Sequence, residues 1–568
     1  MFSDGKIYFA KTGGTLFEKL YLLPKMANRH GFICGATGTG KTVTLKVLAE
    51  SFSQMGVPVF LADVKGDLSG MIAPGAEIED MKKRIETFGL SADGFSFQAF
   101  PSVFFDIFGK KGIPLRTTVS EMGPQLMATI LDLNDTQSDI LSVVYKIADD
   151  ENLLLCDTKD LKAILQYAAE KADEYELEYG RIAKQSISAI VRAIVALEAE
   201  GGDLFFGEPA LNVADFFTTD ISGKGMINIL DSSSLINQPR LYSAFMLYLL
   251  SELFEIMPEI GDPEKPRIVF FFDEAHLLFQ SASPALMEKI EQMIRMIRSK
   301  GIGVFFITQS PGDIPDSIGA QLGNKIEHAL RAYTPAERKS LKAAAEAFRE
   351  NPEFDTLELL SSLGTGEAIV STLDEKGVPG IAQHAHILPP ESRMGMITDE
   401  ERANSIKLSN LYLKYNTPTD PDSAFEFMER RKQQLEETEA QLQAKQAEEK
   451  ARLKAEKEAE KEHLKAEQQA EREREKAEKE AERERQKAEK EAEKERLRAE
   501  KEAEKAAERE RKAVERSIKS VASTAAGSIG REAGHLFGKK LGGSFGKTLG
   551  GNIGASLGRN ILGTLFKH

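Results

Sequence analysis

The sequence lacks tryptophan and has two cysteines, Cys34 and Cys156, among 568 residues. Two cysteines cannot build a framework of disulfide bonds, and a chain of this length can bury a large core without one. Neither cysteine stands in the spacing of a zinc-binding motif. The sequence therefore predicts a protein of a reducing compartment, the cytoplasm.

Long apolar runs are also missing. The first residues, MFSDGKIYFA, lack the basic region and apolar run of a secretory signal. The most apolar internal segment, LYSAFMLYLL from Leu241, is too short to cross a bilayer and is closely followed by Glu252 and Glu255. We expect no membrane-spanning segment in residues 1–440.

Basic residues are outnumbered by acidic ones, 74 against 89, and the formal net charge of the chain is -15. Residues 441–510 hold 21 basic and 23 acidic residues, and residues 511–568 hold 10 basic and 2 acidic residues. Setting these balances of -2 and +8 aside leaves -21 on residues 1–440. Contact with nucleic acid would therefore need a local basic patch within an acidic surface.

Residues 31–415 alternate short apolar runs with longer helical patterns. Continuous apolar runs rich in Val, Ile and Phe are typical of strands buried on both faces of a parallel sheet. Separated by helices, they predict a doubly wound α/β domain, preceded by a short β element in residues 1–30. The runs are GFIC from 31, VPVFLAD from 57, MINIL from 226, RIVFFFD from 267, GVFFIT from 303 and EAIVST from 367.

Residues 115–200 interrupt this alternation with helical patterns alone, such as DLKAILQYAAEKADEY and QSISAIVRAIVALEAE. We interpret them as an all-helical insertion between two strands of the sheet. The alternative is that they are crossover helices of the main fold.

Residues 424–517 consist almost wholly of Glu, Lys, Arg, Gln and Ala. Alanines alternate between spacings of four and seven, an 11-residue repeat that keeps them on one helix face. A helix of about 90 residues would be about 140 Å long. Because alanine buries little area, we interpret the stretch as a solvated spacer helix; the alternative is a coiled coil between copies. The alanines are Ala455, Ala459, Ala466, Ala470, Ala477, Ala481, Ala488, Ala492, Ala499 and Ala503.

Residues 518–568 have a different period, with glycine at every fourth position from Gly530 to Gly558. This glycine zipper lets another helix approach to backbone contact. Glycine costs about 1 kcal/mol of helix propensity per residue, so the segment needs a partner. We expect either a partner helix or an anionic surface such as the inner membrane, which Lys539 and Lys540 would favour. The alternative is a flexible glycine-rich tail.

Residues 35–42, GATGTGKT, match the phosphate-binding pattern G-x-x-x-x-G-K-[ST], or Walker A motif, between an apolar run and a helical pattern. Its glycines let backbone amides wrap phosphates at a helix N-terminus. Lys41 is expected at the β- and γ-phosphates of ATP, and Thr42 at Mg²⁺. The predicted nucleotide-binding residues are Gly35, Ala36, Thr37, Gly38, Thr39, Gly40, Lys41, Thr42 and Val43.

Two further strand ends carry polar residues that ATP hydrolysis needs. RIVFFFDEAH ends in Asp273, expected to hold Mg²⁺, and Glu274, expected to polarise the attacking water as in a Walker B motif. GIGVFFITQSPGDIP ends in Thr308 and Gln309, at the edge where open α/β sheets bind ligands. We predict that Gln309 senses the γ-phosphate. Alternatively, the acidic pair begins a helix and Gln309 is an ordinary turn residue.

Together these elements resemble the HerA-like branch of the HerA/FtsK superfamily of P-loop motor ATPases, and within it the bacterial YjgR-type subfamily. NRHGFICGATGTGKTVTL, LADVKGDLSG, FFFDEAH and FITQSPGDIPDSI carry the resemblance, which covers about residues 1–415. It implies a RecA-like ATPase that uses ATP and Mg²⁺, forms a homo-oligomeric ring of six, and acts on DNA as a translocase or helicase. We expect residues 1–30 to be too short for the β-barrel domain of archaeal HerA helicases.

Ring ATPases of this type place an arginine of one subunit against the γ-phosphate held by the next. NKIEHALRAYTPAERKSL resembles the strand after the sensor in FtsK-like motors, which makes Arg331 and Arg338 candidates for this role. Arg295 and Arg298, which precede the sensor strand, are alternatives.

Asp63 and Asp67 follow the second apolar run and are also expected at the nucleotide edge. Asp63 either supports Mg²⁺ or the nucleophilic water, or caps a loop. His384 and His386 lie in a strand-like segment with no second group of metal ligands nearby in the sequence, and we interpret them as structural.

Two functions follow. The first is a Mg²⁺-dependent ATPase whose ring moves nucleic acid through a central pore. The second is an ATP-switched scaffold, tethered to a membrane or to its own copies through the charged helix and the glycine zipper.

Overall fold

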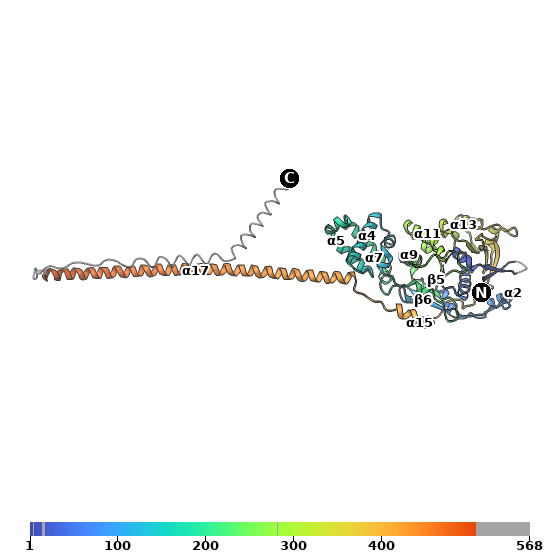
Figure 1. Cartoon of the computed structure of the whole chain (residues 1–568), viewed down its shortest axis with the longest axis horizontal. Helices are drawn as coiled ribbons and strands as arrows, with labels where there is room; N and C mark the ends of the chain where they lie inside the picture. The colour runs from blue at the N-terminus through green and yellow to red at the C-terminus, as the bar shows by residue number, and fades with distance from the viewer. Residues whose placement is uncertain (4, 14–16, 281, 507–568) are drawn as a thin grey trace, which may run out of the picture. The chain divides into compact units, whose positions relative to one another are not determined.

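The computed structural model describes residues 1–3, 5–13, 17–280 and 282–506 (Figure 1). The chain divides into two compact units, residues 1–444 and residues 445–568. The glycine zipper predicted for residues 518–568 lies outside the described residues.

The described part of residues 1–444 is built on one sheet of 13 strands. From β11 through β4, β10, β9, β5, β8 and β6 to β7, all neighbouring strands are parallel. Beyond β11 the sheet continues with β12, β13 and β2 in antiparallel pairs, and β1 and β3 both pair with β2. The strands are β1 (Phe2–Ser3), β2 (Lys6–Thr12), β3 (Lys19–Leu22), β4 (Gly31–Cys34), β5 (Val59–Asp63), β6 (Ser102–Asp106), β7 (Ile113–Pro114), β8 (Ile227–Asp231), β9 (Ile268–Phe272), β10 (Ile302–Thr308), β11 (Asn324–His328), β12 (Glu367–Ser371) and β13 (Gln383–Ile387).

Each of the six apolar runs singled out in the sequence forms a strand: β4, β5, β8, β9, β10 and β12. The predicted fold class, an α/β domain with a mostly parallel sheet followed by a long charged helix, is confirmed. The prediction of a parallel strand is wrong for β12, which is antiparallel to both of its neighbours. An apolar run reports burial on both faces of a sheet and carries no information on strand direction.

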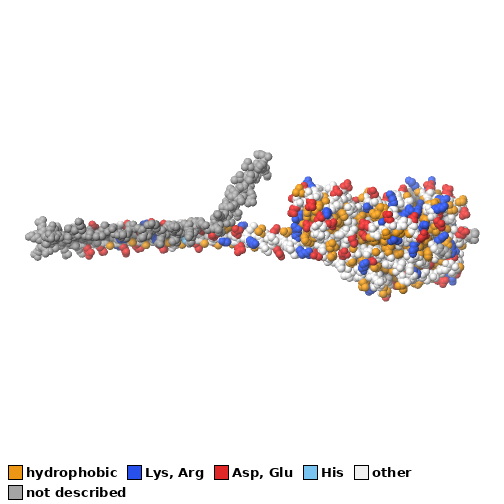
Figure 2. All heavy atoms as spheres, in the orientation of Figure 1, with side chains coloured by type: hydrophobic (Ala, Val, Ile, Leu, Met, Phe, Trp, Pro, Cys, Tyr) orange, Lys and Arg blue, Asp and Glu red, His pale blue; other side chains and the backbone are white. Residues whose placement is uncertain are grey.

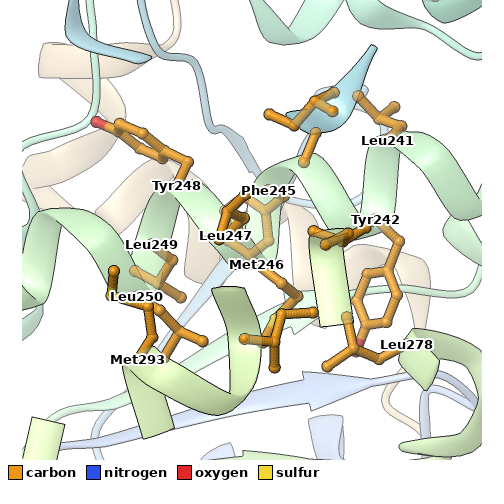
Figure 3. Packing of buried hydrophobic residues seen from close by; sticks show 14 of the residues in the cluster. Leu241, Tyr242, Phe245, Met246, Leu247, Tyr248, Leu249, Leu250, Leu278 and Met293 are labelled. Atoms are coloured by element: carbon orange, nitrogen blue, oxygen red, sulfur yellow. The ribbon is translucent and has the colours of Figure 1, made fainter. Parts of the chain in front are cut away.

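Helices cover both faces of the sheet. Successive residues of β9 point to opposite faces, so Phe270 lies in one buried cluster and Phe271 in the other. On the first face, α9 (Pro239–Ile256) packs its apolar side chains toward Leu278 of α10 and Met293 of α11 (Figure 3). On the second face, α1 (Lys41–Gln54) contributes Leu45. The phosphate-binding motif therefore lies where a buried strand passes into a buried helix.

Helices α3 to α8 follow one another between β7 and β8, and α4, α5 and α7 pack together (Figure 1). The other α-helices of residues 1–444 are α2 (Glu79–Phe88), α3 (Val119–Ile130), α4 (Asp135–Asp150), α5 (Thr158–Glu170), α6 (Ala172–Tyr179), α7 (Lys184–Ala199), α8 (Gly202–Phe205), α10 (His276–Gln280), α11 (Pro284–Ile297), α12 (Asp316–Gly319), α13 (Pro335–Glu346), α14 (Thr356–Ser362), α15 (Asp399–Leu408) and α16 (Asn410–Tyr415). The short 3₁₀-helices are η1 (Pro24–Arg29), η2 (Asp67–Ile72), η3 (Val213–Phe216), η4 (Leu235–Asn237), η5 (Arg298–Lys300) and η6 (Pro311–Asp313).

Within the described residues, the charged stretch forms one helix, α17 (Ala424–Ala506), and its predicted continuation to residue 517 lies outside them. Its first turn is held by Asp160 of α5, whose carboxylate accepts from Ser423 Oγ at 2.6 Å and from Phe425 N at 2.9 Å. Beyond residue 444 every described side chain of α17 is exposed. Figure 2 shows acidic and basic side chains interspersed along the described part of this helix. Among the described residues, none of the helices combines the length and the apolar character that a membrane span requires.

Candidate nucleotide site

The phosphate-binding motif forms the turn between β4 and α1, with Lys41 as the first helical residue. Gly35 and Gly40 have φ angles of 151° and 122°, which side chains of L-residues rarely allow. A Cβ at Gly35 would lie 2.5 Å from His328 Cβ, and one at Gly40 would lie 3.1 Å from Gly366 Cα. The loop thus rests closely on the end of β11 and the start of β12, and glycine is required at both positions.

The side chain of Lys41 folds back over this loop. Its Nζ donates to Gly35 O at 2.5 Å and to Ala36 O at 3.2 Å. Burial lowers the pKa of Lys41, against the attraction of the Glu274 carboxylate. Thr42 follows in the first turn of α1, where backbone N–H groups point out of the helix end. The ammonium group and this helix end together favour an anion at the carboxyl edge of the sheet.

Asp273 and Glu274 follow β9, in the middle of the parallel part of the sheet. Both are buried. Burial, together with the charge of Glu274, raises the pKa of Asp273 to about 6. Burial also opposes the ionisation of Glu274, but Lys65 and Gln309 outweigh it and lower the pKa of Glu274. The pair therefore combines a carboxylate held in its charged form with one that ionises closer to neutral pH.

Three side chains contact the Glu274 carboxylate. Lys65 Nζ lies 2.7 Å from Oε1, and His276 Nδ1 lies 3.3 Å from Oε2. Gln309 Nε2 donates to both carboxylate oxygens at 3.1 Å. Gln309 Oε1 in turn accepts from Thr37 Oγ1 at 3.2 Å. One side-chain amide therefore connects the phosphate-binding loop to the carboxylate.

The backbone of Glu274 lies in the left-handed region, with a φ of 49°. Residues other than glycine adopt this conformation at a cost in free energy. Glu274 N donates to Asp273 Oδ1 at 3.0 Å, and Ala275 N donates to Ile307 O of β10 at 2.8 Å. These bonds hold the turn in which the Glu274 side chain reaches its three partners.

Three residues of this site were not predicted from the sequence, and one of them is His276, which contacts Glu274 as described above. Lys65 follows β5, the neighbour of β9, and contacts Glu274. In the sequence, only its place in LADVKGDLSG, two residues after the end of a predicted strand, could have indicated this contact. His328 lies beneath the loop, with Nε2 2.8 Å from Thr44 Oγ1 and Nδ1 2.8 Å from Glu367 O. Burial lowers the pKa of His328 to about 4, so its ring is neutral. A lone histidine at a strand end has no local pattern that would reveal such a position.

The structure favours one of the two interpretations of Asp63. Its carboxylate accepts from Gly66 N at 2.7 Å and from Leu68 N at 3.0 Å, so it caps the loop after β5. Burial raises its pKa to about 7. Asp67 begins the 3₁₀-helix η2 within this loop.

The candidate arginines lie apart from these contacts. Arg331 is exposed, two residues beyond Ala329, whose carbonyl accepts from Ala36 N at 2.9 Å. Arg338 is exposed on α13, and Arg295 is exposed on α11. Arg298 pairs with Asp262 at 3.6 Å and precedes β10, at the opposite end of that strand from Gln309. In the part of the chain that the structure describes, no hydrogen bond or ion pair joins these arginines to Lys41 or Glu274.

These residues fit a magnesium nucleotide. The close packing at Gly35 and Gly40 leaves a loop of bare backbone that suits phosphate groups. Thr42 and Asp273 supply oxygen atoms, the ligands that Mg²⁺ prefers. The Glu274 carboxylate could contact a water molecule, and the Gln309 amide could contact a phosphate oxygen.

The helicase HerA-like C-terminal family model matches residues 11–481. The DNA double-strand break repair helicase HerA of Sulfolobus acidocaldarius is 23% identical over 391 residues, which cover 65% of this chain and 67% of that protein. The protein of the same name from Sulfurisphaera tokodaii is 21% identical over 387 residues, with the same coverage of 65% and 67%.

Solved structures show weaker similarity. The plasmid coupling protein TrwB in complex with ADP and Mg²⁺ has a TM-score of 0.42 and 15% identity, covering 65% of this chain and 87% of that chain. VirB4 of Thermoanaerobacter pseudethanolicus has a TM-score of 0.42 and 18% identity, covering 71% of this chain and 99% of that chain.

Proposed function

The chain belongs to the helicase HerA-like C-terminal family and is a P-loop ATPase, and from this premise we propose that it is a ring-forming motor that hydrolyses ATP to move DNA. The observation that carries the proposal is the link from Thr37 through Gln309 to Glu274. It joins a loop suited to phosphates with a carboxylate suited to activating water, as coupled ATP binding and hydrolysis require.

In the proposed reaction, the amides of residues 35–43 and Lys41 bind the phosphates of ATP. Thr42 and Asp273 would hold Mg²⁺, which offsets phosphate charge when bound. Glu274 orients the attacking water and accepts its proton, and Lys65 keeps this carboxylate ionised for that step. Gln309 contacts Glu274 already and would exchange its Thr37 contact for the γ-phosphate.

We assign Arg331 and Arg338 as the candidates that complete the site of a neighbouring subunit. Both are exposed, and the backbone near Arg331 is bonded to the phosphate-binding loop of its own subunit. An arginine that acts across a subunit boundary would lack contacts with its own Glu274, as is the case here. A homo-oligomeric ring, with six subunits as in the resembling motors, is the assembly that this role requires.

DNA is the proposed substrate because the two relatives above are named as DNA repair helicases. The balance of -21 on residues 1–440 means that basic side chains would have to be concentrated in the pore of the ring. Binding through such a patch weakens with salt, because each phosphate contact releases counterions.

The second candidate, an ATP-switched scaffold that associates through α17, is favoured by one observation. Four leucines of this helix are between 50% and 58% exposed. At about 100° per residue they fall within about 40° of one another around the helix, a stripe that a second copy could cover. The leucines are Leu435, Leu442, Leu453 and Leu464.

An ATPase assay of the purified chain distinguishes the two functions. It is run with duplex DNA, single-stranded DNA or anionic liposomes, and with Lys41→Ala as the inactive control. A DNA-stimulated rate that falls with added salt supports the motor. A slow rate indifferent to DNA, with liposome binding that is lost on deleting residues 518–568, supports the scaffold. If Lys41→Ala hydrolyses ATP at the wild-type rate, the assignment of the site is wrong.

A further inference from the structure

Three side chains on the antiparallel part of the sheet bring potential metal ligands together. Glu367, His384 and His386 place one ligand atom each within 4.8 Å of one another. Glu367 lies directly opposite His386 in the register of β12 and β13. His384 stands two residues before His386 and therefore on the same face of the strand. The two histidines thus flank one carboxylate from the paired strand.

We propose that Glu367, His384 and His386 bind a divalent transition metal of the Zn²⁺ type. The Glu367 carboxylate lies 3.5 Å from His384 Nε2 and 3.7 Å from His386 Nδ1. Ligand bonds of about 2.0–2.2 Å at tetrahedral angles separate ligand atoms by about 3.3–3.6 Å. The separation to His384, measured to Oε2, lies within this range, and the separation to His386, measured to Oε1, lies just above it.

These separations are too long for direct hydrogen bonds, which need about 2.7–3.2 Å. Among the described residues, His384 Nε2 is buried and has no hydrogen-bond partner. A histidine that served only to pair with Glu367 would be expected to approach its oxygen more closely. The carboxylate and the two imidazoles therefore lie close together without a short hydrogen bond between them.

The surroundings hold the three ligands in place. Gly364 N donates to Glu367 Oε2 at 2.9 Å, the kind of outer contact that orients a ligating carboxylate. The rings of Phe17 and Phe88 lie against His386, with centroids 5.8 Å and 5.4 Å away. A Cβ at Gly13 would lie 2.2 Å from His384 Nδ1, so glycine makes room for that ring.

Two cations lie nearby, and both are bonded to other groups. Arg84 donates to Gly366 O at 2.8 Å and to Ile387 O at 3.1 Å. Lys11 donates to Phe88 O at 2.5 Å and pairs with Asp93 at 3.3 Å. Neither cation forms an ion pair with Glu367 in the described residues, which leaves its charge available to a metal.

The donor set separates this site from the Mg²⁺ site of the nucleotide. Two imidazoles and one carboxylate suit Zn²⁺ and other transition metals, whereas Mg²⁺ prefers oxygen ligands. With three protein ligands, a fourth position stays open for water. These three residues would bind the metal whether or not the chain moves DNA.

The proposed metal would stabilise the start of β12, on which the phosphate-binding loop rests. Gly366 N donates to Thr39 O at 2.8 Å, and Glu367 O accepts from His328 at 2.8 Å. His328 contacts Thr44 of α1 on its other side. Gly366, which bonds to the phosphate-binding loop, directly precedes the proposed metal ligand Glu367.

The test is metal binding by the full chain, freed of any histidine tag, stripped with a chelator and kept without nucleotide. Titration with Co²⁺, followed by its visible absorption and by displacement with Zn²⁺, should show one tight equivalent. His384→Ala, His386→Ala and Glu367→Gln should each weaken binding by at least about 10-fold. His463→Ala, in an exposed histidine of α17, is the matched control and should bind as the wild type does.

Asp273→Asn removes the carboxylate assigned to Mg²⁺ and should also keep the one equivalent of Co²⁺, which excludes uptake at the nucleotide site. The proposal is overturned if the wild type binds no more Co²⁺ than the doubly substituted His384→Ala, His386→Ala chain. Because a misfolded variant would also lose metal, X-ray absorption of the Zn²⁺-loaded wild type provides a second measurement. It should show imidazole ligands, and a spectrum without them contradicts the proposal.

Discussion

The candidate nucleotide site and the proposed metal site lie in one sheet but are built in different ways. At the nucleotide site, side chains leave the carboxyl ends of parallel strands and are positioned by the loops that follow, as Glu274 and Lys65 are. At the metal site, Glu367 and His386 are positioned by the register of two antiparallel strands. The first arrangement allows side chains to exchange partners during a reaction, whereas the second fixes them.

The two regions also differ in what completes them. The proposed metal ligands all come from β12 and β13 of one chain. The nucleotide site has its carboxylate, amide and lysine in place, but its candidate arginines make no contact with them. We therefore expect the nucleotide site to depend on assembly and the metal site to be independent of it.

The largest effect is expected from the arginine that acts between subunits. Arg331→Ala or Arg338→Ala should lower kcat for ATP in the assembled ring by about 10³-fold, because a charge-stabilising group in the transition state is lost. The measurement is steady-state hydrolysis at a protein concentration at which assembly is verified by light scattering. Zn²⁺ binding by the same variants should stay unchanged. If both variants keep wild-type turnover, neither arginine has this role.

Removing the carboxylate that activates water should have the next largest effect. Glu274→Gln keeps the shape of the side chain but cannot accept a proton, so kcat should fall by at least about 10²-fold while ATP still binds. Turnover and nucleotide binding are measured on the same sample. The matched control is Glu288→Gln, in an exposed glutamate of α11, which should behave as the wild type. Equal turnover in the two variants would contradict the role of Glu274.

His328 is the side chain that contacts both regions, through Thr44 of α1 and Glu367 of β12. His328→Leu should lower the free energy of unfolding by about 2–4 kcal/mol, because buried groups of Thr44 and Glu367 each lose a hydrogen-bond partner. Urea denaturation measures this change. His463→Leu on exposed α17 should leave the free energy unchanged. A loss below about 0.5 kcal/mol for His328→Leu would show that the two regions are not joined energetically at this point.

The smallest effect concerns the pH dependence of turnover. The Lys65 ammonium lowers the pKa of Glu274, so Lys65→Met should raise that pKa. Because the base acts in its deprotonated form, the acid limb of the profile of kcat against pH should move to higher pH. Lys82→Met, in an exposed lysine of α2, is the control. A shift to lower pH, or no shift, would contradict the assigned pairing.

The difference between the two regions also explains how much the sequence could predict. The phosphate-binding loop and the acidic pair are local patterns, in which spacing and flanking apolar runs carry the information. Lys65 lies in the motif LADVKGDLSG, but its contact with Glu274 exists only because β5 lies beside β9 in the sheet. His384 and His386 have no further ligand close to them in the sequence. Glu367 lies many residues earlier and reaches them only because β12 pairs with β13. His328 likewise has a partner on each side that only the folded sheet supplies.

The backbone of Glu274 has a consequence for how this protein tolerates change. A left-handed conformation at a residue other than glycine costs about 1–3 kcal/mol of stability. The packing of the surrounding sheet must offset this cost. Glycine would adopt this φ without strain, so Glu274→Gly is expected to relieve part of that cost while abolishing hydrolysis. Selection for stability alone would thus drive this position away from the residue that catalysis requires. In the turn after β9, the residue that hydrolysis requires is therefore not the residue that would give the most stable fold.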